Sequence, residues 1–424
     1  MAKLRSVKGM NDILPTDMGR WHRVEAAFRH RAERYGYAEV RTPLLEPTEL
    51  FVRGIGEVTD IVEKEMYTFE DKGGKTLTLR PEGTASCVRA WLQHSVGGSE
   101  PVTKWYYVGP MYRRERPAKG RYRQFHQVGC EIYGDPGPYV DAELIDMVVG
   151  FLRELGVLDV EVLVNSLGSG DTRERFREAL LAHLEPLRDG LSEDSQRRLQ
   201  TNPLRVLDSK APQDQEAAAS APTLLDFLND EDRAHFEGVQ DTLRALGTPF
   251  RVAPRLVRGL DYYTRTLFEV VGRGGDLGAQ STICGGGRYD GMIGDLGGPP
   301  TPAIGFAMGV ERVLLSMPAE AAAAPLDVFV VAEAGVRTSA TALARDLREA
   351  GLRVEADLRG RSLKSQFRRA DKSGAPVALV LGEREVEAGT VQLKELAKGT
   401  QGSVDRGAVE AAVRGALAPS DEGR

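Results

Sequence analysis

A strongly basic hairpin between two apolar strands constrains this chain of 424 residues more than any other feature. The stretch KWYYVGPMYRRERPAKGRYRQFHQVGCEIYG (104–134) begins and ends with residues typical of strands, and Pro117 and Gly120 mark a turn. Residues 113–123 carry six cations and one anion, Glu115. Six like charges on one hairpin repel one another, so the segment is either a solvated surface loop or a site for an anion.

The alternation of side chains along the second strand favours a site. Successive strand residues point to opposite faces, so one face joins Arg123 to a ring, an amide, a glycine and a carboxylate: Phe125, Gln127, Gly129 and Glu131. The other face is mostly apolar and suits a core: His126, Val128, Cys130 and Ile132. A ring can stack on a base, arginines can bind phosphates, and a carboxylate can pair with an ammonium or imidazole N–H. The polar face therefore predicts a site for a nucleotide and a small cationic molecule.

RPEGTA (80–85) adds a carboxylate, Glu82, and a hydroxyl, Thr84, directly after a predicted strand at 76–80. The alternative is a simple helix cap, with Thr84 as the capping residue. The local sequence is compatible with a ligand-binding turn and with a helix cap.

LVRGLDYYTRTLFEVV (256–271) reads as a strand throughout. Alternation then places Arg258, Leu260 and Tyr262 on one face. The opposite face would carry Asp261, Tyr263 and Arg265.

Two later segments are rich in glycine. ICGGGRYDG (283–291) has three glycines, which we expect to follow a strand and to let backbone or ligand approach closely. A nucleotide-binding oxidoreductase is an alternative, but the pattern is not GxGxxG and no βαβ unit follows. AIGFAMGVERVLL (303–315) predicts a strand that enters a helix, with Arg312 in the first turn, where it could reach a phosphate or simply lie at the surface. No activated nucleophile appears, so the site favours catalysis by positioning and charge stabilisation.

Composition bounds the remaining possibilities. Lys and Arg total 56 against 62 Asp and Glu, a net charge of −6 that by itself argues against a nucleic-acid partner. The cations are nevertheless concentrated in 113–123 and 359–372, each with six cations and one anion, and such clusters suit phosphates. Three distant cysteines without CxxC spacing argue against a thiolate metal site and fit a reducing cytoplasm: Cys87, Cys130 and Cys284. We expect no secretory signal and no membrane span.

Composition also suggests where the boundaries between domains lie. PAEAAAAP (318–325) reads as a linker, and beyond it strands and helices alternate in a small α/β domain at 325–424. Residues 168–250 read as a helical insertion, or alternatively as a helical part of the main domain. The flanking parts, 1–167 and 251–318, would then build one domain around an antiparallel sheet, an α+β fold.

The motifs together resemble those of class II aminoacyl-tRNA synthetases, and specifically the histidyl-tRNA synthetase family. GYAEVRTPLLEPTELF (36–51) resembles motif 1, with Pro43 at the family's dimer interface. Residues 104–133 resemble motif 2, and GFAMGVERVL (305–314) resembles motif 3. The peptides around Arg258 and the three glycines resemble the family's two histidine signature peptides, and KGMNDILP and RPEGTA also fit.

The resemblance implies a role for each matching residue. Arg258 and Arg113 would be catalytic, at the α-phosphate of ATP. ATP would also meet Glu115, Arg121, Phe125 and Arg312. Histidine would be enclosed by Glu82, Gly83, Thr84, Arg113, Gln127, Glu131, Arg258, Tyr262 and Tyr263. The tRNA would meet Arg116, Arg359, Arg361, Lys364, Arg368 and Arg369.

The implied reaction joins L-histidine to tRNA(His) through a histidyl-adenylate, in a cytoplasmic homodimer, with Mg²⁺ accompanying ATP. The C-terminal domain would bind the anticodon. The alternative within the same fold is a non-catalytic regulatory subunit of ATP phosphoribosyltransferase, which resembles the catalytic core without an anticodon domain and with eroded signature peptides. This sequence keeps both peptides and about 100 residues after the linker.

Overall fold

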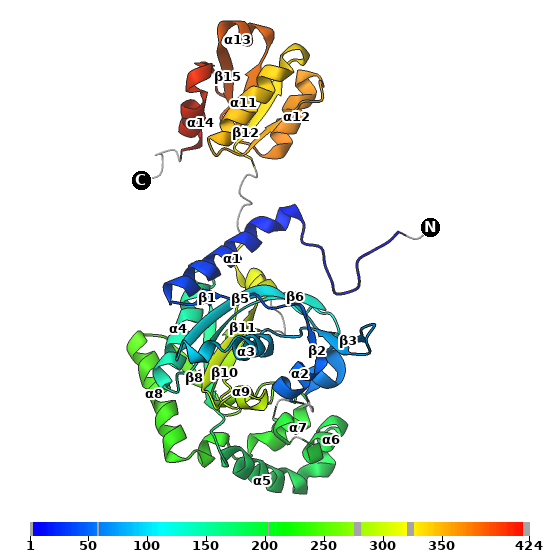
Figure 1. The fold of residues 1–424 in the computed structure, drawn as a ribbon, viewed down its shortest axis with the longest axis vertical. Coiled ribbons are helices and arrows are strands. Elements are labelled where there is room, and N and C mark those ends of the chain that lie inside the picture. The colour runs from blue at the N-terminus through cyan, green and yellow to red at the C-terminus, as the bar shows by residue number, and fades with distance from the viewer. Residues whose placement is uncertain are drawn as a thin grey trace. The chain divides into compact units, whose positions relative to one another are not determined.

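The computed structural model describes residues 3–56, 59–201, 203–207, 209–274, 281–319 and 326–418. It divides into two compact units, Met1–Ala319 and Glu320–Arg424 (Figure 1). The predicted linker at 318–325 lies outside the described residues from residue 320 onward. In the described part of the chain, no helix combines the length and the apolar character needed to cross a membrane.

A large, mainly antiparallel sheet forms the centre of the first unit, which confirms the predicted α+β fold. Among the described residues it has eight strands, in the order β1 (Ala38–Glu39), β5 (Thr103–Tyr112), β6 (Gln124–Tyr133), β11 (Ala303–Gly309), β10 (Thr282–Arg288), β9 (Thr264–Gly272), β7 (Val160–Ser166) and β8 (Phe250–Val252). The two edge strands, β1 and β8, pair in parallel with their neighbours, and the pairs between them are antiparallel. Strands distant in sequence thus meet at the centre of the sheet.

Helices cover one face of this sheet and bury its core. They are α1 (Pro15–Arg34), α4 (Pro138–Glu154), α8 (Asp230–Leu246) and α10 (Val310–Ser316). Helix α1 begins with Pro15, whose fixed φ suits a first helical turn, and its regularly spaced apolar residues are buried. Val128, Cys130 and Ile132 of β6 lie in the same core, as their alternation predicts. The opposite face of the sheet is thereby left for the site.

Shorter elements border that opposite face. A three-stranded sheet orders β2 (Leu45–Pro47), β4 (Thr76–Leu79) and β3 (Tyr67–Glu70). Beside it lie α2 (Thr48–Ile55), η1 (Ile61–Glu65), α3 (Thr84–Gln93), η2 (Val96–Gly98) and α9 (Met292–Asp295). The strand predicted at 76–80 corresponds to β4.

A helical segment between β7 and α8 has a hydrophobic core of its own. Its elements are α5 (Thr172–Leu184), η3 (Glu185–Gly190), α6 (Glu193–Thr201), η4 (Pro203–Val206), α7 (Pro212–Ala219) and η5 (Leu224–Phe227), which Figure 1 shows gathered in green. That core also takes in Tyr263 and Leu267, so the segment packs against the chain leading into β9. Helix α8 falls within the range predicted as an insertion but packs into the main core through Phe236, Val239 and Leu243.

The second unit is a five-stranded sheet with helices. Its order among the described residues is β13 (Val354–Ala356), β12 (Val328–Ala332), β14 (Val377–Leu381), β15 (Thr390–Glu395) and β16 (Gln401–Asp405). The first three strands are parallel and the last two antiparallel. The helices are η6 (Ala334–Val336), α11 (Arg337–Glu349), α12 (Leu363–Ser373), α13 (Glu383–Ala388), η7 (Arg406–Ala408) and α14 (Val409–Leu417). The predicted alternation of strand and helix is confirmed.

Candidate active site

Small residues from three strands form the floor of the site. Gly129, Ala307, Gly285 and Glu269 are successive partners across β6, β11, β10 and β9. A Cβ atom added to Gly285 would lie 2.4 Å from Cζ of Arg258, and one added to Gly305 would lie 1.8 Å from a carboxylate oxygen of Glu131. The three glycines thus lie inside β10 and not after a strand, but their predicted role, close approach, is confirmed.

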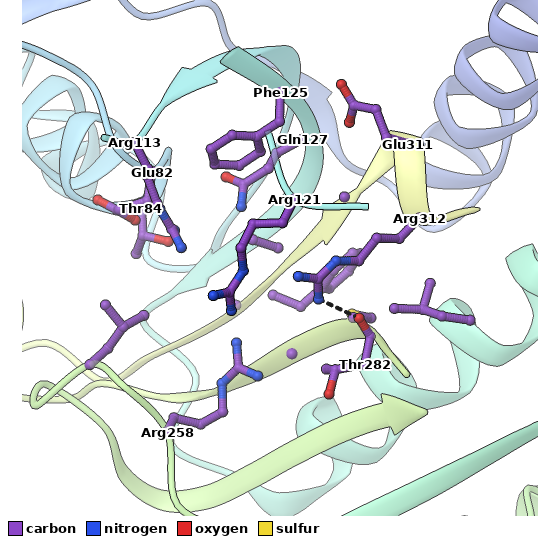
Figure 2. A pocket seen from close by; sticks show the side chains of 18 of the residues that line it. Glu82, Thr84, Arg113, Arg121, Phe125, Gln127, Arg258, Thr282, Glu311 and Arg312 are labelled. Atoms are coloured by element: carbon purple, nitrogen blue, oxygen red, sulfur yellow. Dashed lines mark hydrogen bonds between the residues drawn. The ribbon is translucent and has the colours of Figure 1, made fainter. Parts of the chain in front are cut away.

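One pocket lies above this floor (Figure 2). It brings together residues that the sequence predicted from four separate segments. Those that line it are Glu82, Thr84, Arg113, Glu115, Arg121, Phe125, Gln127, Arg258, Tyr262, Tyr263 and Arg312. Glu131 lies directly beneath, bonded to Thr84 and to Tyr289, and Gly83 packs its backbone against the ring of Tyr107. Arg116 is exposed and does not line the pocket.

Phe125 and Gln127 of the hairpin line the pocket, on the face that alternation predicts for them. Phe125 lies in the pocket with the guanidinium of Arg113 5.3 Å from its ring centre. Glu115 pairs with Arg121 at 2.9 Å, and burial raises the pKa of the Glu115 carboxyl although Arg121 and Arg113 oppose that shift. Arg123 directly precedes β6 and is not among the residues that line the pocket; its Nε donates to the backbone oxygen of Glu115 at 3.2 Å.

Two buried carboxylates, Glu82 and Glu131, occupy one end of the pocket. The carboxylate of Glu82 accepts hydrogen bonds from the backbone N–H groups of Thr84 (2.7 Å) and Ala85 (2.9 Å), so Glu82 and not Thr84 caps α3. Thr84 instead donates its hydroxyl hydrogen to Glu131 at 2.7 Å, and the hydroxyl of Tyr289 donates to the other oxygen. Burial raises the pKa of Glu82, and it raises the pKa of Glu131 to about 8. A cationic or N–H-donating ligand would offset the cost of charging Glu131 there.

The other end of the pocket is cationic. Figure 2 shows the guanidinium groups of Arg121, Arg258 and Arg312 converging from three elements. Arg312 is held by the backbone: Nε donates to the oxygen of Gly120 at 3.0 Å and Nη1 to the oxygen of Thr282 at 2.6 Å. Burial and then the charge of Arg121 lower the pKa of Arg312. Converging arginines repel one another, and a polyanion would relieve that repulsion.

The prediction of a continuous strand over 256–271 is wrong. The strand β9 begins only at Thr264, and Arg265 has a left-handed backbone with φ of +43°. Residues before Thr264 form a loop, in which successive side chains do not alternate between two faces. Arg258, Tyr262 and Tyr263, which alternation placed on two faces, line the same pocket.

Three contributors to the site were missed by sequence reasoning. Glu269 bonds to Arg258, Thr282 holds both Glu269 and Arg312, and Tyr289 supports Glu131. A signal existed for Glu269, because it is a single charge within the apolar run LFEVV. No local pattern distinguishes Thr282 or Tyr289, whose partners lie far away in the sequence.

The candidate nucleic-acid residues of the second unit differ in how they are paired. Arg369 is bound by Asp357 at 2.7 Å and by Glu355, and Arg359 lies 3.7 Å from Asp357. The exposed cations are Arg359, Arg361, Lys364 and Arg368. In the described part of the chain, no cluster of three or more His, Cys, Asp or Glu could hold a metal ion.

Comparison with known proteins places this geometry in a family. A family model described as histidyl-tRNA synthetase matches residues 9–313, and one described as an anticodon binding domain matches residues 327–415. A histidine--tRNA ligase of Sorangium cellulosum (strain So ce56) is 59% identical over 396 residues, which make up 93% of this chain and 92% of that relative.

Solved structures agree with this assignment. The apo histidyl-tRNA synthetase of S. aureus matches with a TM-score of 0.81 and 36% identity, over 97% of this chain and 100% of that one. An ATP phosphoribosyltransferase regulatory subunit/histidyl-tRNA synthetase from Bacillus halodurans C matches with a TM-score of 0.67 over 90% of this chain and 99% of that one; at 22% identity it supports the fold alone. The hairpin, the signature peptides and these relatives together show that the chain belongs to the histidyl-tRNA synthetase family.

Proposed function

We propose that this protein joins L-histidine to tRNA(His) at the expense of ATP, through a histidyl-adenylate. The observation that carries the proposal is the pocket itself, which places a buried carboxylate, Glu131, at one end and three arginines at the other. The carboxylate suits an imidazole N–H, and the arginines suit a triphosphate. The 59% identical histidine--tRNA ligase supports the same activity.

Histidine would bind over the glycine floor. Glu131, fixed by Thr84 and Tyr289, would accept a hydrogen bond from the imidazole. Glu82 and Gln127, both nearly buried, would face the α-ammonium group, and the paired rings of Tyr262 and Tyr263, with centres 4.6 Å apart, would close the pocket. Gly83 leaves room for the Tyr107 ring behind this subsite.

ATP would bind at the cationic end. Its adenine would lie on Phe125, with Glu115 beside the base, and Arg121 and Arg312 would bind the terminal phosphates. Arg113 and Arg258 would flank the α-phosphate. When the histidine carboxylate attacks the α-phosphorus and pyrophosphate leaves, the additional negative charge would develop between these two arginines. We propose Mg²⁺ as part of the MgATP substrate, where phosphate oxygens and water supply most ligands.

The second step transfers histidine from the adenylate to a terminal ribose hydroxyl of the tRNA. We propose that Arg116 and its neighbours on the hairpin approach the acceptor end. Residues 325–424 would bind the anticodon, and 1–167 with 251–318 would form the catalytic core around an insertion at 168–250. We also propose a cytoplasmic homodimer, with the Pro43 region at its interface; Leu44 and Leu45 in that region are each 41% exposed.

A regulatory subunit of ATP phosphoribosyltransferase is the less supported alternative. The relative whose title includes that function is only 22% identical. This chain also has residues matching an anticodon binding domain. A regulatory role would not need the arginine and carboxylate ends of the pocket together.

The decisive test is ATP–pyrophosphate exchange with each amino acid offered in turn. We expect exchange with histidine and none above background with the others, because the site is built to pair the buried carboxylate of Glu131 with an imidazole N–H. Absence of histidine-dependent exchange in a protein that binds ATP would refute the proposed activity.

The cations of the second unit give a further prediction. Replacing Arg361, Lys364 and Arg368 together with alanine should raise the KM for tRNA about tenfold and reduce the salt dependence of charging, because each contact with a phosphate releases counterions. Histidine-dependent exchange should stay unchanged. Arg353→Ala is the matched control, since Arg353 is an exposed cation of the same unit that pairs with Asp327 at 2.6 Å. Equal losses of charging and exchange would contradict the proposed division of labour.

A further inference from the structure

We propose that Glu269 and Thr282 are positioning residues that set the two half-buried arginines, Arg258 and Arg312, at the phosphate site. This proposal rests on the proposed role of Arg258 at the α-phosphate. Glu269 lies on β9 and Thr282 at the start of β10, and the sequence motifs assigned no role in the site to either residue.

The first link is the ion pair between Arg258 and Glu269. Nη1 of Arg258 donates to Oε1 of Glu269, and the side chains are only 25% and 14% exposed. Burial is the largest single effect and lowers the pKa of Arg258, but the charge and hydrogen bond of Glu269, together with the two tyrosines Tyr263 and Tyr262, raise the pKa overall. Because Arg258 comes from a loop, it needs such a partner to be held in one orientation.

The second link fixes Glu269 itself. Its other oxygen, Oε2, accepts a hydrogen bond from the hydroxyl of Thr282 at 3.1 Å. The backbone oxygen of Thr282 accepts the bond from Nη1 of Arg312, drawn as a dashed line in Figure 2. One residue therefore connects the Arg258 pair to Arg312, and the two arginines are set on one sheet framework.

The sheet floor explains why this arrangement is possible. Glu269 is the cross-strand partner of Gly285, so both point to the site face of the sheet. The guanidinium of Arg258 lies where a side chain at Gly285 would be, with Glu269 at its side. Sheet register and the absent side chain thus direct Arg258 toward the pocket, and the carboxylate sets its angle.

A positioning role predicts a specific kinetic effect. Glu269→Gln keeps the size of the side chain and one acceptor oxygen but removes the charge. We expect kcat of histidine-dependent exchange to fall by about 10²-fold, since a small misplacement of a catalytic group costs that much. The KM values for ATP and histidine should change less than about threefold, because the loss concerns the transition state.

The matched control lies on the neighbouring strand. Glu161 of β7 also binds two arginines, Arg251 and Arg273, each at 2.9 Å, but at the exposed surface. Glu161→Gln should leave exchange unchanged. The Thr282 link is tested by Thr282→Val, which removes the hydroxyl and keeps the backbone oxygen. We expect a fall of about threefold to tenfold in kcat, restored by Thr282→Ser.

Other outcomes would overturn the proposal. If Glu269→Gln lowers the melting temperature but leaves kcat intact, the pair serves stability only. If kcat rises, Glu269 sequesters Arg258 and does not position it. If the wild-type protein shows no histidine-dependent exchange, the proposed function fails instead. Equilibrium binding of an ATP analogue with a methylene bridge between its α- and β-phosphates separates the two failures. A wild-type protein that binds the analogue but shows no exchange refutes the proposed function. A Glu269→Gln protein that binds the analogue and exchanges like the wild type refutes only the positioning role.

Discussion

Replacing Arg258 with alanine should abolish adenylation, lowering the rate of histidine-dependent exchange by about 10²–10³-fold. The guanidinium lies over the glycine floor at the cationic end of the pocket, where we expect charge to develop as the histidine carboxylate attacks. Neither Arg121 nor Arg312 can take its place, because Arg121 is paired with Glu115 and Arg312 is held by two backbone oxygens. The measurement is exchange at saturating ATP and histidine.

Two further variants control for loss of folding. Arg258→Lys keeps the charge without the planar fork and should recover only a part of the rate. Arg251→Ala removes an arginine from an exposed pair with Glu161 and should leave exchange normal. We expect all three proteins to unfold at similar temperatures. Near-normal exchange in a folded Arg258→Ala protein would remove Arg258 from the mechanism.

Replacing Glu131 with glutamine should raise the KM for histidine by about 10²-fold, with the KM for ATP nearly unchanged. The carboxylate is fully buried and its two oxygens are already oriented by Thr84 and Tyr289. Loss of a charged acceptor in such a site costs a charge-assisted hydrogen bond and its orientation. An unchanged KM for histidine would show that the imidazole binds elsewhere.

The pH dependence of the same variant gives an independent check. Burial raises the pKa of Glu131 to about 8, so the free protein holds this carboxyl mainly protonated at pH 7. Since the imidazole N–H needs the ionised form, kcat/KM for histidine should rise with pH through an inflection near 8. The Glu131→Gln protein should lack that inflection and retain only the titration of histidine itself.

Stability without ligand should follow the opposite trend. The folded pKa of Glu131 exceeds its ordinary value of 4.5, so the folded state holds the proton more tightly than the unfolded state. This contribution to the free energy of unfolding is complete below pH 4.5 and is lost as pH rises through about 8. Between pH 6 and pH 9 the wild type should therefore lose stability that Glu131→Gln keeps, so the melting temperature of the variant should rise relative to that of the wild type.

Local sequence predicted the parts of the site that lie on regular elements. On β6, strict alternation separated Gln127 and Glu131 from the core residues Val128 and Cys130, because a strand repeats every two residues. Alternation failed where the chain leaves the strand geometry: Tyr262 and Tyr263 precede β9, and no periodicity reports the path of a loop.

The sequence by itself determined the hairpin, its charge, the glycine run and, through its motifs, the family. Only the tertiary structure decided which groups face each other across the pocket. The pairs Arg258–Glu269, Tyr289–Glu131 and Arg312–Thr282 join different elements, and their contacts depend on the register of four strands. Charge and periodicity are local properties of the chain, whereas register between distant strands is fixed by packing of the whole sheet.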